Sequence, residues 1–392
     1  MQLENDHNVY VLGAGFSREA GLPLISDFLL QMRDSHEWLQ TQGREAEAKA
    51  VSRVLEFRLA ATSAAYWVNL DLENIEELFS LASASSGGMD QNVRLAIAAT
   101  LDFARARQPS PRREMLIQGK SAVFKDTSDG KPLHRPRWAK PKTPRGQPTS
   151  GIAGPYDISL YAYYVARLLG MFEDVEGNPK GQNTFISFNY DTLVEEALRE
   201  LEIQFCYGFK PGTVNFDPSA AREGADSDVH LLKLHGSVNW ARPKAKRNRL
   251  TVYGDYDDVR KSGAVPELVP PTWKKVFENQ MEAVWERAVE RLNSATRIVI
   301  IGFSMPPTDM HFKYLIAAGL QNNISLRQIL FVKPDAEELA GRVGVVLRKA
   351  YIDSHKIGFA SEELYRFLLS SGSHSKIGRP LEKGIEPIIK DP

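Results

Sequence analysis

Five short apolar runs recur along the chain, and each has the length of a β-strand. They are Val9–Gly15, Thr184–Phe188, His230–His235, Arg297–Phe303 and Gln328–Pro334. Helical patterns follow most of them, and these open at Asp191-Thr192, at Asp309 and at Asp335. Uninterrupted apolar runs are typical of buried parallel strands. The repeated order of strand and then helix therefore predicts an α/β fold with a Rossmann-like, doubly wound parallel sheet.

A long insertion separates the first of these runs from the second. It spans about 170 residues, far more than a strand-to-helix connection requires. Helical patterns fill much of it, at Glu37–Ala61, Asn74–Ser85, Asn92–Arg107 and Asp157–Phe172. We therefore predict a large inserted helical subdomain at residues 30–180 within a sheet domain of residues 1–369. Residues 370–392 read as a polar tail.

Within the insertion, residues 105–148 are rich in proline, lysine and arginine. Only Glu114, Asp126 and Asp129 oppose the positive charge. One interpretation is a solvated, partly mobile loop. The other is a contact surface for nucleic acid or an acidic partner.

Composition narrows the cellular setting. Hydrophobic residues make up 43% of the chain, charged residues 25%, and the net charge is zero, so the overall charge indicates neither nucleic acid nor membrane. Cys206 is the only cysteine, which excludes an intrachain disulfide and a cysteine-built zinc site. The sequence shows no signal-peptide pattern and no apolar run long enough to cross a bilayer. We expect a cytoplasmic protein.

The loop after the first strand has the composition of a phosphate-binding loop. It contains Gly13, Ala14, Gly15, Phe16, Ser17, Gly21 and Pro23. It does not match the dinucleotide fingerprint, because Arg18 stands where the third glycine belongs, and no G-K-[ST] follows to make a P-loop. Exposed amides, a helix N-terminus and a serine hydroxyl still suit a pyrophosphate. The alternative is a tight structural turn.

Polar residues also follow three other strands. They are Asn189 and Asp191, then His235, Gly236 and Ser237, and finally Gly302, Ser304, Asp309 and His311. Each has a plain structural explanation as a helix cap, a loop histidine or a turn. Parallel strands end at one edge of a sheet, however, so these groups are predicted to face the glycine loop across one cleft.

These motifs, in this order, resemble those of the sirtuin-like family. The resemblance rests on Gly13-Ala14-Gly15-Phe16-Ser17, Phe188-Asn189-Tyr190-Asp191, Lys233-Leu234-His235-Gly236 and Gly302-Phe303-Ser304. It implies that the first motif binds the NAD pyrophosphate and that Asn189 and Asp191 frame the nicotinamide ribose. It also implies that His235 is the catalytic base and that Ser304 and Asp309 lie on the adenosine side.

Two departures separate this chain from the protein deacylases of that family. Those enzymes follow the proline with Asp-Phe-Arg, whereas Leu24-Ile25-Ser26 follow Pro23 here. They also carry a four-cysteine zinc module, which a chain with one cysteine cannot form. The chain looks more like the bacterial sirtuin-like NADases of anti-phage defence. That resemblance implies a homo-oligomer and the option of a HerA-type ATPase partner.

The expected reaction cleaves NAD, as a substrate, to nicotinamide and ADP-ribose, with no metal. Nicotinamide leaves as a neutral molecule, so no general acid is needed to expel it, unlike the leaving group of an O-glycoside. Asn189 is expected to bond a ribose hydroxyl and the attacking water, and Asp191 to anchor the carboxamide or stabilise positive charge. Two alternatives stay open: a sensor that binds NAD or ADP-ribose without cleaving it, and an ADP-ribosyl transferase or deacylase.

Overall fold

A computed structural model describes residues 6–68, 70–85, 88–108, 112–118, 121–124, 133–134, 152–171, 179, 181–220, 227, 229–244, 249–269, 279–304, 310–334 and 356–360. In the strands between residues 112 and 158, in residues 356–360, and at residues 64, 65, 68, 279, 310 and 311, it describes only the backbone. The helix expected after Asp335, the side chain of Asp309 and the tail from residue 370 lie outside the described residues.

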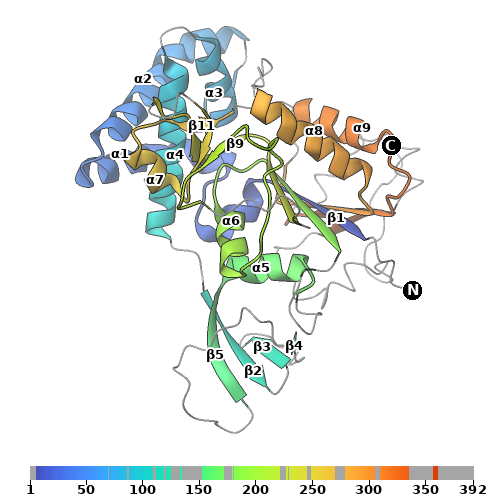
Figure 1. Cartoon of the computed structure of the whole chain (residues 1–392). Helices are drawn as coiled ribbons and strands as arrows, with labels where there is room; N and C mark the ends of the chain where they lie inside the picture. Colours follow the sequence, from blue (N-terminus) through green and yellow to red (C-terminus); the bar gives the residue numbers. More distant parts are fainter. Residues whose placement is uncertain are drawn as a thin grey trace.

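A six-stranded parallel sheet forms the centre of the molecule (Figure 1). Its strand order is β14-β13-β12-β1-β6-β8. The strands are β1 (His7–Leu12), β6 (Gln182–Ser187), β8 (Val229–Lys233), β12 (Arg297–Ile301), β13 (Gln328–Val332) and β14 (Lys356–Ala360). The five apolar runs correspond to five of these strands, so the prediction of a doubly wound α/β sheet is confirmed. The sequence reading missed β14.

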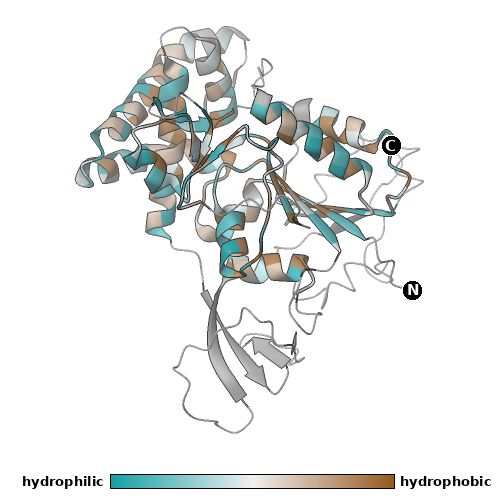
Figure 2. Ribbon diagram, in the orientation of Figure 1, coloured by the Kyte–Doolittle hydropathy of each residue, from teal (hydrophilic) through white to brown (hydrophobic). Residues whose placement is uncertain are grey.

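Helices cover both faces of this sheet. In the view of Figure 1, α8 (Asn279–Asn293) and α9 (Met310–Leu320) lie above it, and α5 (Leu160–Leu168) and α6 (Leu193–Glu200) lie below. The hydroxyl of Tyr10 in β1 donates to the Leu168 carbonyl of α5. Residues Val9 to Leu12 of β1 are fully buried. The helices carry hydrophilic and hydrophobic residues along their length, as amphipathic helices do (Figure 2).

Four further helices form a unit between β1 and β6. They are α1 (Phe28–Thr41), α2 (Glu45–Val68), α3 (Ile75–Ala84) and α4 (Met89–Arg107). The single helix expected over Glu37–Ala61 is divided, because Gly43 adopts a left-handed φ of 67° between α1 and α2. Asn74 caps α3, its side chain accepting from the Glu76 amide at 2.9 Å.

Two smaller sheets complete the described structure. A mixed sheet has the order β11-β9-β10-β7, and the helix α7 (Tyr256–Lys261) lies beside it. Its strands are β7 (Asn215–Phe216), β9 (Gly236–Ala241), β10 (Thr251–Val252) and β11 (Pro266–Leu268). An antiparallel sheet has the order β4-β3-β2-β5 and lies below the rest of the molecule in Figure 1.

Three strands of the antiparallel sheet lie in the basic segment 105–148, for which a loop was expected, and the fourth follows that segment. Its strands are β2 (Arg112–Gln118), β3 (Ser121–Phe124), β4 (Leu133–His134) and β5 (Ile152–Ser159). The insertion therefore contains strands as well as helices, and α5 begins at Leu160 rather than at Asp157. Proline and charged residues are unfavourable in strands, and their abundance in this segment obscured the sequence pattern of the short strands β2, β3 and β4.

Candidate active site

The register of the strands brings the predicted site segments together at the C-terminal edge of the sheet. Leu12 at the end of β1 pairs with Ser187 of β6 and with Ile301 of β12, and Ser187 pairs with Lys233 of β8. The chain segments that leave these four strands therefore start side by side. Strand order also reverses on either side of β1, and open α/β sheets bind ligands at such a switch point.

The glycines of the first loop permit a close approach of two backbone segments. A Cβ on Gly302 would lie 2.3 Å from the Phe16 nitrogen, and one on Gly13 would lie 2.5 Å from the Phe303 Cα. Gly302 also has a left-handed φ of 59°. The Gly15 amide donates to the Gly302 carbonyl at 2.8 Å. In this structure, contact between the loop and Gly302 accounts for the glycines, a reason that the sequence did not indicate.

This contact also occupies several loop amides. The Gly13 amide donates to Ile301 at 3.0 Å, and the Phe16 amide donates to Gly13 at 2.9 Å. With Gly15 also bonded, Ala14 carries the first loop amide to which the described structure assigns no acceptor. Of the amides expected to meet a phosphate, Ala14 is therefore the best placed.

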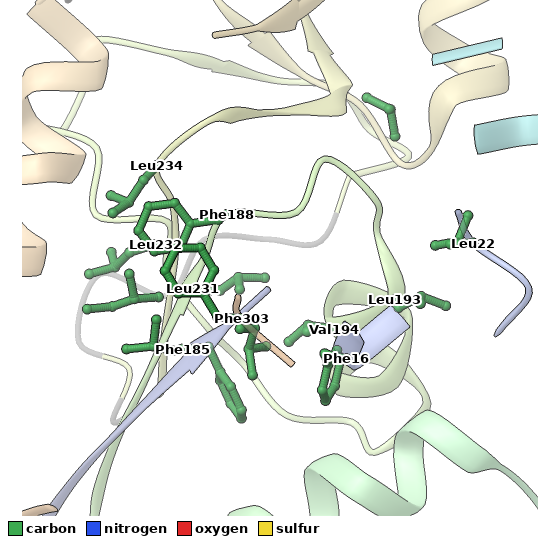
Figure 3. Close-up of a cluster of buried hydrophobic side chains, with 14 of the residues drawn as sticks. Phe16, Leu22, Phe185, Phe188, Leu193, Val194, Leu231, Leu232, Leu234 and Phe303 are labelled. Carbon is green, nitrogen blue, oxygen red and sulfur yellow. The ribbon is translucent and has the colours of Figure 1, made fainter. Parts of the chain in front are cut away.

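The predicted helix after the loop is a short 3₁₀ helix, η1 (Ala14–Ala20). It ends at Gly21, whose left-handed φ of 79° forms its C-cap. A second 3₁₀ turn, η2 (Ile25–Asp27), leads into α1. Phe16 is buried in the hydrophobic cluster drawn in Figure 3, which also includes Phe188 and Phe303. Phe16 and Gly21 therefore fix the conformation of the loop, Phe16 by packing in the core and Gly21 by ending η1, and neither lines the cavity.

A chain of hydrogen bonds joins three of the predicted residues. The Asn189 side-chain amide donates from Nδ2 to the Gly13 carbonyl at 2.9 Å and to Ser17 Oγ at 3.0 Å. Ser17 Oγ donates in turn to Asp191 Oδ2 at 2.7 Å. The Leu193 amide donates to Asp191 Oδ1 at 3.0 Å. The N-cap residue of α6 is Thr192, not Asp191. Asp191 precedes it and binds the first amide of the helix with one oxygen and Ser17 with the other, so the helix start and the candidate site share this carboxylate.

These bonds limit what Asn189 can offer a ligand. Nδ2 carries two hydrogens, and both have acceptors within the protein. Only Oδ1 remains, so Asn189 can accept a hydrogen bond from a ligand hydroxyl or water but has no free hydrogen to donate. The expected dual role of this amide therefore narrows to that of an acceptor.

His235 lies against aromatic rings at the end of β8. Its ring meets Phe188 edge-on, with 5.1 Å between centroids and 82° between planes, and the Tyr190 ring lies 6.2 Å away. Only 4% of the residue is exposed. The Val269 amide donates to its carbonyl at 2.8 Å. Aromatic packing therefore holds the imidazole ring, and the backbone hydrogen bond holds the main chain that carries it.

Gly236 follows His235 and allows the chain to turn into β9. A Cβ at this position would lie 2.1 Å from the Glu267 carbonyl oxygen, and φ is 78°. Gly236 therefore supports the site through its backbone, and it does not line the cavity.

A buried ion pair lies beneath the site. Lys233 Nζ is 3.2 Å from Glu195 Oε1, and each side chain is only 1% exposed. Lys233 also donates to the Asp191 carbonyl. Burial raises the pKa of Glu195, and the charge of Lys233 opposes that rise. The sequence signal for this pair is Lys233 itself, because a lysine within an otherwise apolar strand requires a buried partner of opposite charge.

One cavity of about 780 Å³ joins these groups. Of the predicted site residues, it is lined by Gly13, Ala14, Gly15, Ser17, Pro23, Asn189, Asp191, His235, Gly302 and Ser304. The inserted unit also lines the cavity. The segment before α3 contributes Asp71, Glu73 and Asn74, α3 contributes Ile75, Glu76 and Phe79, and α4 contributes Ile97 and Leu101. The sequence analysis predicted this inserted unit but did not indicate which of its residues line the cavity.

Two searches of the described residues concern metal and membrane. Within that part of the chain, no group of three or more histidine, cysteine, aspartate or glutamate residues could hold a metal ion. No helix there is long and apolar enough to cross a membrane.

Solved structures of Sir2 proteins resemble this fold at low sequence identity. One, described as "Structural Basis for the Mechanism and Regulation of Sir2 Enzymes", has a TM-score of 0.37 and 12% identity over 93% of this chain and 90% of its own. A mutant Sir2 homologue in complex with 2′-O-acetyl ADP ribose has a TM-score of 0.35 and 13% identity, over 97% of this chain and 96% of its own. No curated protein matches the sequence.

The family comparison is specific to one part of the chain. Residues 183–352 match the SIR2-like domain family. The matched segment runs from β6 beyond β13, so it contains Asn189, Asp191, His235 and Gly302, whereas the glycine loop precedes it. Residues 183–352 are therefore similar to the SIR2-like domain family, over somewhat less than half of the chain.

Proposed function

We propose that this protein is a sirtuin-like NAD⁺ hydrolase that releases nicotinamide and ADP-ribose. The observation that carries the proposal is the single cavity in which a glycine loop, the Asn189–Ser17–Asp191 chain and the imidazole of His235 meet. A glycosidic bond to a cationic base needs a held ribose, negative charge near the developing cation and a positioned water. The cavity offers a group for each task.

The hydrogen bonds suggest how these tasks are divided. Asn189 Oδ1 accepts from a ribose hydroxyl or from the attacking water. Asp191, held by Ser17 and the Leu193 amide, supplies negative charge to an oxocarbenium-like centre. His235 accepts the proton of the water as general base. Because packing fixes the imidazole, little reorganisation would accompany proton transfer.

The remaining expected contacts concern the nucleotide. The pyrophosphate would lie against the Ala14 amide, which lines the cavity beside Gly13 and Gly15. Ser17 gives its one hydroxyl hydrogen to Asp191, so its part is to hold that carboxylate rather than to donate to a phosphate. Ser304 would face the adenosine. The assignment of Asp309 to that side, and of His311 to the cofactor-binding residues, rests on the sequence alone.

The proposed biological role is anti-phage defence by depletion of cytoplasmic NAD. Such an activity must be restrained in an uninfected cell. We therefore propose a homo-oligomer of low basal activity, switched on by a HerA-type ATPase, another partner or nucleic acid at the basic segment 105–148. The lining of the cavity by α3 and α4 supports a role for the inserted unit in this control.

The direct test is incubation of the purified full chain with NAD, with nicotinamide and ADP-ribose followed by chromatography. His235→Ala and Asn189→Ala should each lower the rate by about 10²–10⁴-fold, the usual cost of losing a positioned base or partner. His36→Ala is the matched control, because His36 lies in α1 and bonds Ser52 rather than lining the cavity.

The outcomes separate the candidate functions. Nicotinamide release without an acceptor, lost in both site variants, supports hydrolysis. Thermal stabilisation by NAD without nicotinamide release would indicate a sensor. Turnover that requires an added acceptor would indicate a transferase or deacylase. A His235→Ala variant with the wild-type rate would refute the base assignment.

A further inference from the structure

Tyr161, in the first turn of α5, contacts the glycine loop and is not among the residues that line the cavity. Its hydroxyl donates to the Phe16 carbonyl at 3.0 Å and accepts from the Ala20 amide at 3.1 Å. The residue is 2% exposed. One phenol thus bonds two backbone groups of η1, although α5 lies more than a hundred residues further along the chain.

The two backbone groups are the natural partners in an α-helix. There the amide of residue 20 would donate directly to the carbonyl of residue 16, four positions earlier. The Tyr161 hydroxyl lies between them and bonds to both. Insertion of a polar group into this ladder is a recognised cause of local distortion, and here the turn is a 3₁₀ helix.

The ring of Tyr161 is as firmly held as its hydroxyl. It packs edge-on against Phe16, at 5.4 Å and 71°, and against Tyr164, at 5.5 Å and 72°. Ser159 caps α5 at this end, its hydroxyl accepting from the Ala162 amide at 3.1 Å. Burial raises the pKa of Tyr161 well above its usual range, so the hydroxyl keeps the proton that it donates to Phe16.

The distorted turn contains the residue at the centre of the site. Ser17 lies between Phe16 and Ala20, and it must reach Asn189 at 3.0 Å and Asp191 at 2.7 Å at once. A turn that closed its own α-helical bond would rotate Ser17 relative to these partners. It would also move the adjacent Ala14 amide.

We propose that Tyr161 is a positioning residue that holds the glycine loop in its ligand-binding shape by inserting its hydroxyl between the Phe16 carbonyl and the Ala20 amide. The inference rests on the proposed function in one respect only, that the loop binds the pyrophosphate. It assigns Tyr161 no contact with the substrate, and no catalytic step depends on it directly.

The test compares Tyr161→Phe with Tyr163→Phe in the full-length protein. Tyr163 lies in the same helix, is 1% exposed, and its hydroxyl accepts from Arg167 Nε at 3.0 Å. Tyr161→Phe keeps the ring contacts with Phe16 and Tyr164, so the fold should survive, which thermal melting verifies. Each variant deletes one buried hydroxyl of the same helix.

Binding of ADP-ribose, measured by calorimetry, is the main readout, and NAD turnover is the second. Loss of one buried hydrogen-bonded hydroxyl should weaken ADP-ribose binding about tenfold in Tyr161→Phe. Turnover should show a raised KM. Tyr163→Phe should bind ADP-ribose as the wild type does, whatever its melting temperature.

Unchanged affinity in folded Tyr161→Phe, or equal weakening in both variants, would overturn the proposal. A wild-type protein that binds ADP-ribose but releases no nicotinamide would refute hydrolysis and leave this comparison valid. A wild-type protein that binds no ADP-ribose would refute both.

Discussion

Acidification should destabilise this protein through two buried histidines. Both lie near the N-terminal ends of their strands, whereas the candidate site lies at the C-terminal ends. His7 begins β1, and its ring nitrogens lie 3.0 Å from Ser294 Oγ and from Thr184 Oγ1. His230, in β8, accepts at Nε2 from Arg291 Nη2 at 2.8 Å. A neutral imidazole suits all three contacts, whereas a protonated His230 would turn a donor toward the arginine.

Burial is the main cause of their low affinity for protons, and neighbouring positive charge adds to it. Burial, followed by the charge of Arg291, lowers the pKa of His7 to about 4. Burial, followed by Arg291 and Arg287, lowers the pKa of His230 to about 3. In the unfolded chain, both should return to the ordinary histidine value of about 6.5.

The direction of the effect follows from which state binds more protons. Well above pH 6.5, as at pH 7.5, both histidines are almost entirely neutral in both states and contribute almost no pH dependence. As the pH falls below 6.5, the unfolded chain binds protons that the folded chain does not, until the folded values near 4 and 3 are reached, so the free energy of unfolding falls. Between pH 7.5 and pH 5, each histidine should lower the free energy of unfolding by about 2 kcal/mol, and the pair should lower it by about 4 kcal/mol.

Urea unfolding of wild type, His7→Gln, His230→Gln and the double variant, followed by tryptophan fluorescence, measures this loss at pH 7.5, 6.5, 5.5 and 5.0. The variants separate the histidines from carboxylates that also titrate toward acid. Each single variant should lose about 2 kcal/mol less than wild type over the range, and the double variant about 4 kcal/mol less. If the double variant loses as much as the wild type, the histidines are not responsible and the reasoning is wrong.

Three further predictions follow from the site. Gly302→Ala should abolish ADP-ribose stabilisation in a thermal shift assay, because its Cβ would lie 2.3 Å from the Phe16 nitrogen at a left-handed φ; unchanged stabilisation would mean that this contact does not shape the loop. Lys233→Met should reduce the free energy of unfolding by about 3–5 kcal/mol, because it leaves the carboxylate of Glu195 buried without its partner, and pairing it with Glu195→Leu should restore most of the loss in urea titrations. Chelators should change neither the melting temperature nor NAD cleavage, and stoichiometric zinc by metal analysis would contradict the expectation that no metal is required.

Local pattern was sufficient for five of the six strands of the parallel sheet and for the positions of the candidate groups along the chain. An apolar run bounded by glycine or polar residues reports a buried strand, and parallel strands end at one edge, so Asn189, Asp191 and His235 could be assigned to one cleft before any contact was known. Side-chain chemistry and position relative to a strand end are properties of a short segment. They can be read without knowing which segments become neighbours.

The tertiary structure alone decided what those groups bond to. Sheet register sets Gly302 against the glycine loop, and this contact explains glycines that the sequence assigned to a phosphate. The same contacts leave Asn189 only an acceptor, place Tyr161 behind the loop and bury Lys233 beneath it. Each of these pairings joins residues far apart in the chain. Their geometry depends on register and packing of the whole sheet, which no short window of sequence encodes.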